Sequence, residues 1–211
     1  MSFHDYRSYL STELEAMFQV KISVDGNLFS HFTPSGKAYP ELQSRVDAME
    51  SRISISADAG NEATRSSLLV SHILWEAVAE YDLGIFFEPS VEISQDETPD
   101  LPHKLNGKYD CGINLHKIDF ISPIIAVVEV KPTQIASGLG QCLAEMYATL
   151  KKFQQDRVYG IITDGEVWKF LFLENSTLTV DRKGCYISNV ADIVDRIGYM
   201  AGQFLNTDTS D

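Results

Sequence analysis

The chain has 211 residues, of which 17 are Lys or Arg and 30 are Asp or Glu, so its formal net charge is −13. Hydrophobic residues make up 44% and charged residues 22%, a composition typical of a globular domain and not of a disordered chain. This acidity argues against a protein that coats nucleic acid non-specifically. It leaves room for a local site whose charge a divalent metal makes less negative.

The sequence also argues against a membrane or secreted protein. No apolar run reaches the roughly 18 residues that span a bilayer, and the first residues contain acids instead of an uninterrupted apolar segment. The three cysteines, Cys111, Cys142 and Cys185, are widely spaced and form no CxxC pair, which disfavours disulfides and structural zinc. We therefore expect a cytoplasmic protein without a membrane partner.

The first 60 residues have a mixed pattern. Apolar residues recur at helical spacing over 6–18, and the Asp25-Gly26 pair is a hairpin-turn signal. A short helix is predicted near 41–54, followed by a loop. We interpret 1–60 as a helical and mixed extension packed on a core at 61–206, with 207–211 as a disordered tail.

The core begins with a strong helix and continues with strands. The helix is predicted over 61–81, with Asn61 as its N-cap. A strand broken by Pro89, a polar loop and two further strands follow; the strands are expected at 85–93, 109–116 and 124–131.

The C-terminal third adds two helices and a hairpin. Amphipathic helices are predicted over 137–155 and 188–205, the second with Ser188 as a possible N-cap. Between them, two strands flank an Asp164-Gly165 turn. The order of elements predicts an α/β domain with a central mixed β-sheet flanked by helices.

The stretch IIAVVEVKP at 124–132 places two charges at the end of the most apolar strand. Side chains alternate along a strand, so Glu129 and Lys131 share one face. One interpretation is that the strand simply emerges into solvent and ends at Pro132. The other requires a third polar group nearby.

Asp110 is the candidate for that group. If the strands at 110–116 and 124–131 pair antiparallel, Asp110 lies beside Glu129 and Lys131. Two converging carboxylates form an oxygen-ligand site suited to Mg²⁺ or Mn²⁺. A nearby lysine can position a water or stabilise charge on a phosphate. Together these groups predict metal-assisted phosphodiester hydrolysis.

Asp110 followed by Glu129-Val130-Lys131 resembles the PD-(D/E)xK nuclease superfamily, although Tyr109 stands where that motif has proline. The resemblance spans about 61–173 and includes the segment YGIITDGEVWKFLFL, which is similar to a hairpin of restriction-type subunits. It implies a restriction-endonuclease-like fold and a Mg²⁺-dependent nuclease that hydrolyses DNA.

The resemblance also implies two further site residues. Glu62 heads the helix before the sheet, where many members place an acid that completes the metal shell. Gln141 lies on the helix after the ExK tripeptide, where some subfamilies have Q-xxx-Y. Here Glu145 occupies the position of that tyrosine, so Tyr147 is assigned to packing. The predicted site is therefore Asp110, Glu129, Lys131, Glu62 and Gln141, with a metal held by Asp110, Glu129 and Glu62.

Other functions remain open at this point. The same fold could serve as a catalytically silent interaction or regulatory module, which the negative charge favours. A small-molecule enzyme would need a cofactor loop, which we do not find. Gly138 and Gly140 could present N–H groups to a phosphate, or simply begin a helix. DNA is the expected partner, and a homodimer or a partner subunit is possible.

Overall fold

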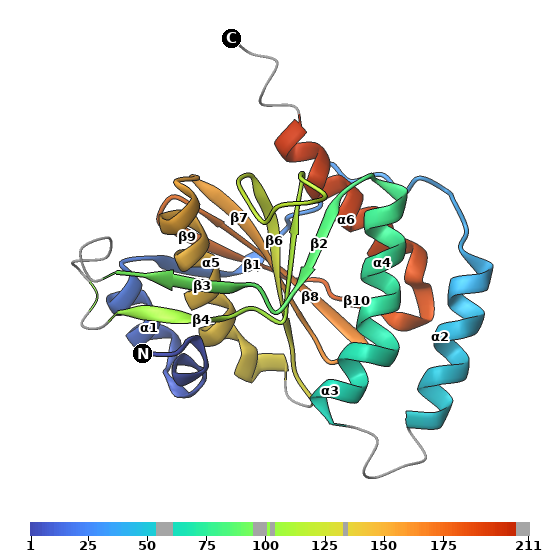
Figure 1. Ribbon diagram of the computed structural model, residues 1–211, viewed down its shortest axis with the longest axis horizontal. Coiled ribbons are helices and arrows are strands. Elements are labelled where there is room, and N and C mark those ends of the chain that lie inside the picture. Colours follow the sequence, from blue (N-terminus) through green and yellow to red (C-terminus); the bar gives the residue numbers. More distant parts are fainter. Residues whose placement is uncertain (54–60, 95–100, 102–103, 133–134, 206–211) are drawn as a thin grey trace.

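The computed structural model describes residues 1–53, 61–94, 101, 104–132 and 135–205. Its centre is an eight-stranded sheet in the order β1-β9-β8-β7-β6-β5-β2, with β10 paired to β8 (Figure 1). The strands are β1 (Lys21–Gly26), β2 (Gly84–Phe87), β5 (Cys111–Asn114), β6 (Ile124–Val130), β7 (Arg157–Thr163), β8 (Val167–Glu174), β9 (Thr177–Asp181) and β10 (Cys185–Tyr186). A second sheet pairs β3 (Ser90–Ile93) with β4 (Leu105–Lys108).

The main sheet is mixed. β6 pairs with β7, and β1 with β9, in parallel, whereas the other neighbours run antiparallel. Helices cover both faces (Figure 1). The predicted α/β class, with a central mixed sheet flanked by helices, is therefore confirmed.

Two groups of helices form these outer layers. On one face lie α2 (Pro40–Ile53), α4 (Ser71–Glu80) and α6 (Val190–Leu205). On the other lie the 3₁₀ segment η1 (Phe3–Ser8), α1 (Ser11–Phe18) and α5 (Leu139–Phe153). Shorter pieces join them: α3 (Glu62–Arg65), the π-helical segment η2 (Ser66–Val70), and the 3₁₀ segments η4 (Ile135–Gly138) and η5 (Ile187–Asn189).

β6 is buried along its whole length. Val128 and Val130 pack with the α4 and α6 layer, whereas Val127 packs with the α5 layer. A strand with helices on both faces must be apolar on both sides, which explains the five apolar residues that begin it. Alternation then directs Glu129 and Lys131 toward α5.

Several predicted elements are confirmed with small shifts at their ends. The helix predicted over 61–81 is observed as α3, η2 and α4, and Asn61 Oδ1 accepts a hydrogen bond from the Thr64 N–H at 2.9 Å. The predicted hairpin is β7–β8, where Asp164 Oδ1 accepts the Val167 N–H at 2.8 Å. The predicted strand break at Pro89 separates β2 from β3, which belong to different sheets.

Other predictions are wrong. Asp25-Gly26 forms no hairpin, because β1 continues to Gly26 and pairs in parallel with β9. A Cβ on Gly26 would lie 2.2 Å from Thr179 Cγ2, so glycine is needed there for close strand approach. The predicted first helix is divided between η1 and α1, because Tyr9 and Leu10 are extended.

The C-terminal helix begins differently from the prediction. Ser188 is not its N-cap but lies within η5. The Val190 N–H instead donates to Gln43 Oε1 from α2, at 3.0 Å. A long-range side chain therefore satisfies the helix end, which local sequence could not reveal.

The segment that we set apart as an N-terminal extension is continuous with the rest of the fold. β1 is a strand of the main sheet, α1 packs in the α5 layer and α2 in the α4 layer. Much of the predicted polar loop before β4 and the predicted tail at 207–211 lie outside the described residues. Within the described part of the chain, none of the helices has the length and apolarity to cross a membrane.

Candidate active site

Asp110 and the end of β6 meet as the sequence predicted. β5 and β6 pair antiparallel, with Cys111 opposite Val128. The Val130 N–H donates to Asp110 Oδ2 at 2.6 Å, so Asp110 lies beside the backbone that carries Glu129 and Lys131. The expected antiparallel pairing is confirmed, and it brings the aspartate to the ExK tripeptide.

Tyr109 holds Asp110 in this place. Its side chain is fully buried, and its hydroxyl lies 2.9 Å from Thr149 Oγ1 and 3.3 Å from the Glu145 carbonyl oxygen, to which it donates. Both partners lie on α5. The residue at the position of the family's proline thus ties the start of β5 to the helix beneath the site.

Glu129, Lys131 and Gln141 form a closed network. The Lys131 ammonium makes an ion pair with Glu129 Oε1 and donates to Gln141 Oε1 at 3.1 Å. Gln141 Nε2 donates to Glu129 Oε2 at 2.7 Å. Glu129 is 1% exposed and Lys131 6%, so the interpretation that the strand end emerges into solvent is wrong for these residues.

Glu145 is a fourth member that sequence reasoning missed. It is fully buried on α5, and Gln141 Nε2 donates to its Oε1 at 3.1 Å. Among the described residues, none donates a hydrogen bond to Glu145 Oε2. Burial and the neighbouring Glu129 raise the Glu145 pKa well above its ordinary value. Both effects favour the protonated, neutral form of Glu145.

The sequence did contain a signal for Glu145. It follows Gln141 by four residues on one helix, so both side chains lie on the same face. We passed over it because the family pattern has tyrosine at that position. The spacing alone, without the pattern, would have placed a carboxyl group beside Gln141.

The site holds more negative charge than its single lysine neutralises. Burial raises the Glu129 pKa to about 7, with a further contribution from Asp110 and an opposing one from Lys131. Burial also raises the Asp110 pKa; the Val130 N–H opposes this and Glu62 adds to it. Burial lowers the Lys131 pKa, but Glu129 outweighs it, so the net direction is upward and the ammonium stays charged.

Glu62 lies near Asp110, although it is exposed. Both line a cavity of about 360 Å³ whose other lining residues are Ala63, Ser66, Ser67, Phe87 and Glu88. Arg65 fixes α3 over the sheet by donating to the Asp164 carbonyl at 2.8 Å and pairing with Glu166. Ser66 and Ser67 belong to the π-helical segment, a distortion that is frequent at functional sites.

Glu88 is a second acid that the sequence did not single out. It lies in the turn between β2 and β3 with φ +50°, a left-handed conformation uncommon for a residue other than glycine. Its N–H donates to the Asp110 carbonyl at 3.2 Å, and its carboxylate pairs with Lys108 at 2.9 Å. It reaches the cavity through this turn and not through any spacing visible in the sequence.

Gly138 and Gly140 have a packing role. A Cβ on Gly138 would lie 2.7 Å from Ile162 Cγ2 and 3.5 Å from Lys131 Cγ. A Cβ on Gly140 would lie 2.1 Å from the Tyr6 carbonyl oxygen. Both glycines therefore let the start of α5 approach β7 and η1 closely, which favours the helix-start interpretation over a phosphate loop.

The donor set fits a hard divalent cation. In the part of the chain that the structure describes, no group of three or more His, Cys, Asp or Glu side chains is arranged to hold a metal ion. Mg²⁺ usually takes only one or two protein carboxylates, with water and substrate phosphate at its other positions. Asp110 and Glu129 supply two carboxylates; burial is the main cause of the raised pKa of each, and a neighbouring carboxylate adds to it.

Comparison with known proteins adds no assignment. None of the models of known protein families matches the chain, and no curated protein matches it. The function must therefore be inferred from the geometry of these residues.

Proposed function

We propose that this protein is a Mg²⁺- or Mn²⁺-dependent nuclease with a restriction-endonuclease-like fold that hydrolyses phosphodiester bonds in DNA. The observation that supports this most is the hydrogen bond from the Val130 N–H to Asp110, which brings Asp110 beside the buried Glu129–Lys131 pair. A carboxylate pair can hold the cation of metal-assisted phosphoryl transfer, and a lysine beside it can stabilise charge on the phosphate.

Each residue has a distinct role in this proposal. Asp110 and Glu129 would hold the cation, and Glu62 would add negative charge from the cavity that it shares with Asp110. A bound cation would supply the Lewis acid that polarises the phosphoryl group. Lys131 would orient the attacking water and stabilise negative charge on the phosphate. Gln141 would keep Glu129 and Lys131 in place through its two hydrogen bonds.

The test is incubation of supercoiled plasmid and of single-stranded DNA with the purified protein in Mg²⁺ or Mn²⁺. A Lys131→Ala preparation is the parallel control. We expect cleavage by the parent and a loss of at least about 100-fold in the variant, the size typical of losing a group that stabilises transition-state charge. Absence of cleavage by the parent, together with absence of thermal stabilisation by either cation, would contradict the proposal.

A second candidate is a silent interaction module with the same site. The observation that favours it is that both Glu129 oxygens already have partners, Lys131 and Gln141. A network closed on itself can serve stability alone. Stabilisation by Mg²⁺ or Mn²⁺ that Glu129→Ala abolishes would decide against this candidate.

A further inference from the structure

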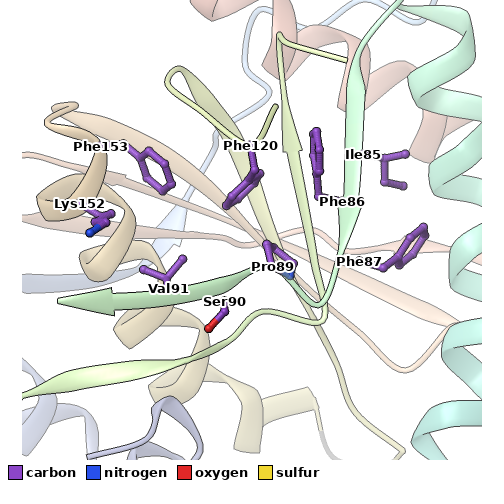
Figure 2. A pocket seen from close by; sticks show the side chains of 9 residues that line it. All are labelled: Ile85, Phe86, Phe87, Pro89, Ser90, Val91, Phe120, Lys152 and Phe153. Carbon is purple, nitrogen blue, oxygen red and sulfur yellow. The ribbon is translucent and has the colours of Figure 1, made fainter. Parts of the chain in front are cut away.

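An aromatic groove lies along the outer edge of the main sheet, where β2 is the last strand. Its volume is about 610 Å³. Figure 2 shows the rings of Phe86, Phe120 and Phe153 following one another. The Phe120 centroid lies 5.4 Å from each of the other two. The remaining lining residues are Ile85, Phe87, Pro89, Ser90, Val91 and Lys152. A volume in this range is usual for a small-ligand site.

The rings of this aromatic groove are accessible. Phe87 is 52% exposed, and Phe86, Phe120 and Phe153 are each only partly buried. Exposing several large rings in one hollow costs free energy, because each would be more stable in the core. Phe120 packs against Phe86, Phe153 and Tyr109, and the ring area that this packing leaves exposed is available to a ligand.

The charge of the groove contrasts with that of the chain. The protein carries −13, yet Lys152 is the single charged side chain among the nine lining residues. Lys152 is exposed, at the end of α5 beside Phe153 (Figure 2). An ammonium beside aromatic rings suits a ligand with flat apolar faces and a negative backbone.

The groove adjoins the proposed active site at one residue, Phe87, whose ring lies on the other side of β2 from Phe86 (Figure 2). Phe87 lines both the groove and the cavity of Glu62, Glu88 and Asp110. Glu88, the next residue, donates its N–H to the Asp110 carbonyl. A nucleic-acid strand whose bases lie in the groove would therefore pass close to these carboxylates with its backbone.

We propose that the aromatic groove binds unstacked bases of a single-stranded nucleic acid, so that single strands or frayed ends are the substrates of the site. This inference rests on the proposed nuclease function and specifies its substrate. Stacking on aromatic rings is available to every base, but bases inside an intact duplex are already stacked on one another. The groove would therefore distinguish single-stranded from double-stranded nucleic acid, but not one base sequence from another.

The test measures binding without cleavage. The parent protein is titrated into a fluorescein-labelled oligothymidine, and into a duplex of equal length, in EDTA, which withholds the divalent cation that cleavage would need, while anisotropy is recorded. We expect the single strand to bind at least about tenfold more tightly than the duplex. Phe87→Ala should weaken single-strand binding by about fivefold to a hundredfold, as for loss of one stacking ring. Phe87→Tyr should restore it.

Two controls separate stacking from general effects. Tyr186→Ala removes another exposed aromatic side chain, 62% exposed on β10, and should leave binding unchanged. Lys152→Gln should lower the salt dependence of single-strand binding by about 0.7 in the log–log slope, and Lys183→Gln should not. Phe87 and Lys152 are exposed, so these variants should fold.

Three results would overturn the inference: equal affinity for single strand and duplex, no effect of Phe87→Ala, or a dimer that Phe87→Ala converts to a monomer. The last would show that a second copy covers the groove. In each case, plasmid cleavage by the parent would leave the proposed nuclease standing. Single-strand binding that depends on Phe87, without cleavage by the parent, would support the binding role of the groove and contradict the proposed nuclease activity.

Discussion

Two buried carboxyl clusters in this protein differ in how completely their oxygens are satisfied. Asp195, 5% exposed on α6, accepts the Ser35 N–H at 2.7 Å, the Ser35 hydroxyl at 2.8 Å and the Tyr81 hydroxyl at 3.2 Å. Donors therefore reach both of its oxygens. Glu129 pairs with Lys131 and shares the amide of Gln141 with Glu145, whose second oxygen accepts no hydrogen bond from the described residues. Burial raises the Glu145 pKa well above its ordinary value.

The difference separates a structural carboxylate from a candidate functional one. A buried acid with enough donors stabilises the fold and has no electrostatic need for a ligand. An acid cluster with too few donors is unfavourable unless it takes up a proton or a cation. By this criterion the end of β6 is the candidate site, and the Asp195 cluster is not a candidate.

The largest effect on stability is expected from removing the Lys131 ammonium, which pairs with Glu129. Lys131→Met leaves Glu129 buried without its partner and should lower the free energy of unfolding by about 3–5 kcal/mol, measured by urea titration. Ser35→Ala, which removes one of three donors to Asp195, should cost only about 1 kcal/mol. Equal losses of unfolding free energy in the two variants would contradict the proposed difference between the two clusters.

A pH dependence of stability should come next in size. The Glu129 pKa is about 7 in the folded chain against an ordinary value of 4.5, so between these values the folded chain binds more protons than the unfolded one. The free energy of unfolding must then fall as pH rises through this window, by on the order of 3 kcal/mol from Glu129. Glu129→Gln cannot ionise, so its stability should fall less between about pH 5 and pH 8. Parallel curves for parent and variant would refute the raised pKa.

A divalent cation should stabilise the protein through the cluster that contains Glu129 and not through the cluster that contains Asp195. Mg²⁺ or Mn²⁺ at about 100 times its dissociation constant should raise the free energy of unfolding by about 2.7 kcal/mol. The gain should vanish in Glu129→Gln and persist in Asp195→Asn, as followed by thermal denaturation. A gain that survives in Glu129→Gln would place the cation elsewhere.

The smallest effect is expected at Glu145. If this acid is already neutral, Glu145→Gln preserves its shape and changes stability at pH 7 by less than about 1 kcal/mol. Asp195→Asn should cost more, because it replaces an acceptor oxygen that has donors with an amide that donates. Urea titration of both variants compares them, and a larger loss at Glu145 would mean that it is ionised.

Local patterns made much of this fold predictable. Helical periodicity identified α4 and α5, and the apolar run with its terminal charges identified β6. The antiparallel pairing that brings Asp110 beside Glu129 was a condition of the sequence argument, and β5 and β6 meet it. These features are encoded over a few residues or between neighbouring elements.

What the sequence missed depends on partners that are distant in the chain. β9 and β10 are short, and their assignment depends on pairing with β8. β1 was misread because its neighbour is β9, not an adjacent strand. In the site, Glu88 reaches Asp110 through a backbone turn, whereas Glu145 was visible in spacing and set aside in favour of a family pattern.

The pairing of β1 with β9 has a consequence for the order of events on the ribosome. Lys21 is synthesised long before Thr177, its partner in β9. Until then β1 is a strand without its partner, open to pairing with other nascent chains. Its exposed Lys21 and Asp25, charged side chains of the kind that discourage edge-to-edge association, would protect the nascent chain during this wait.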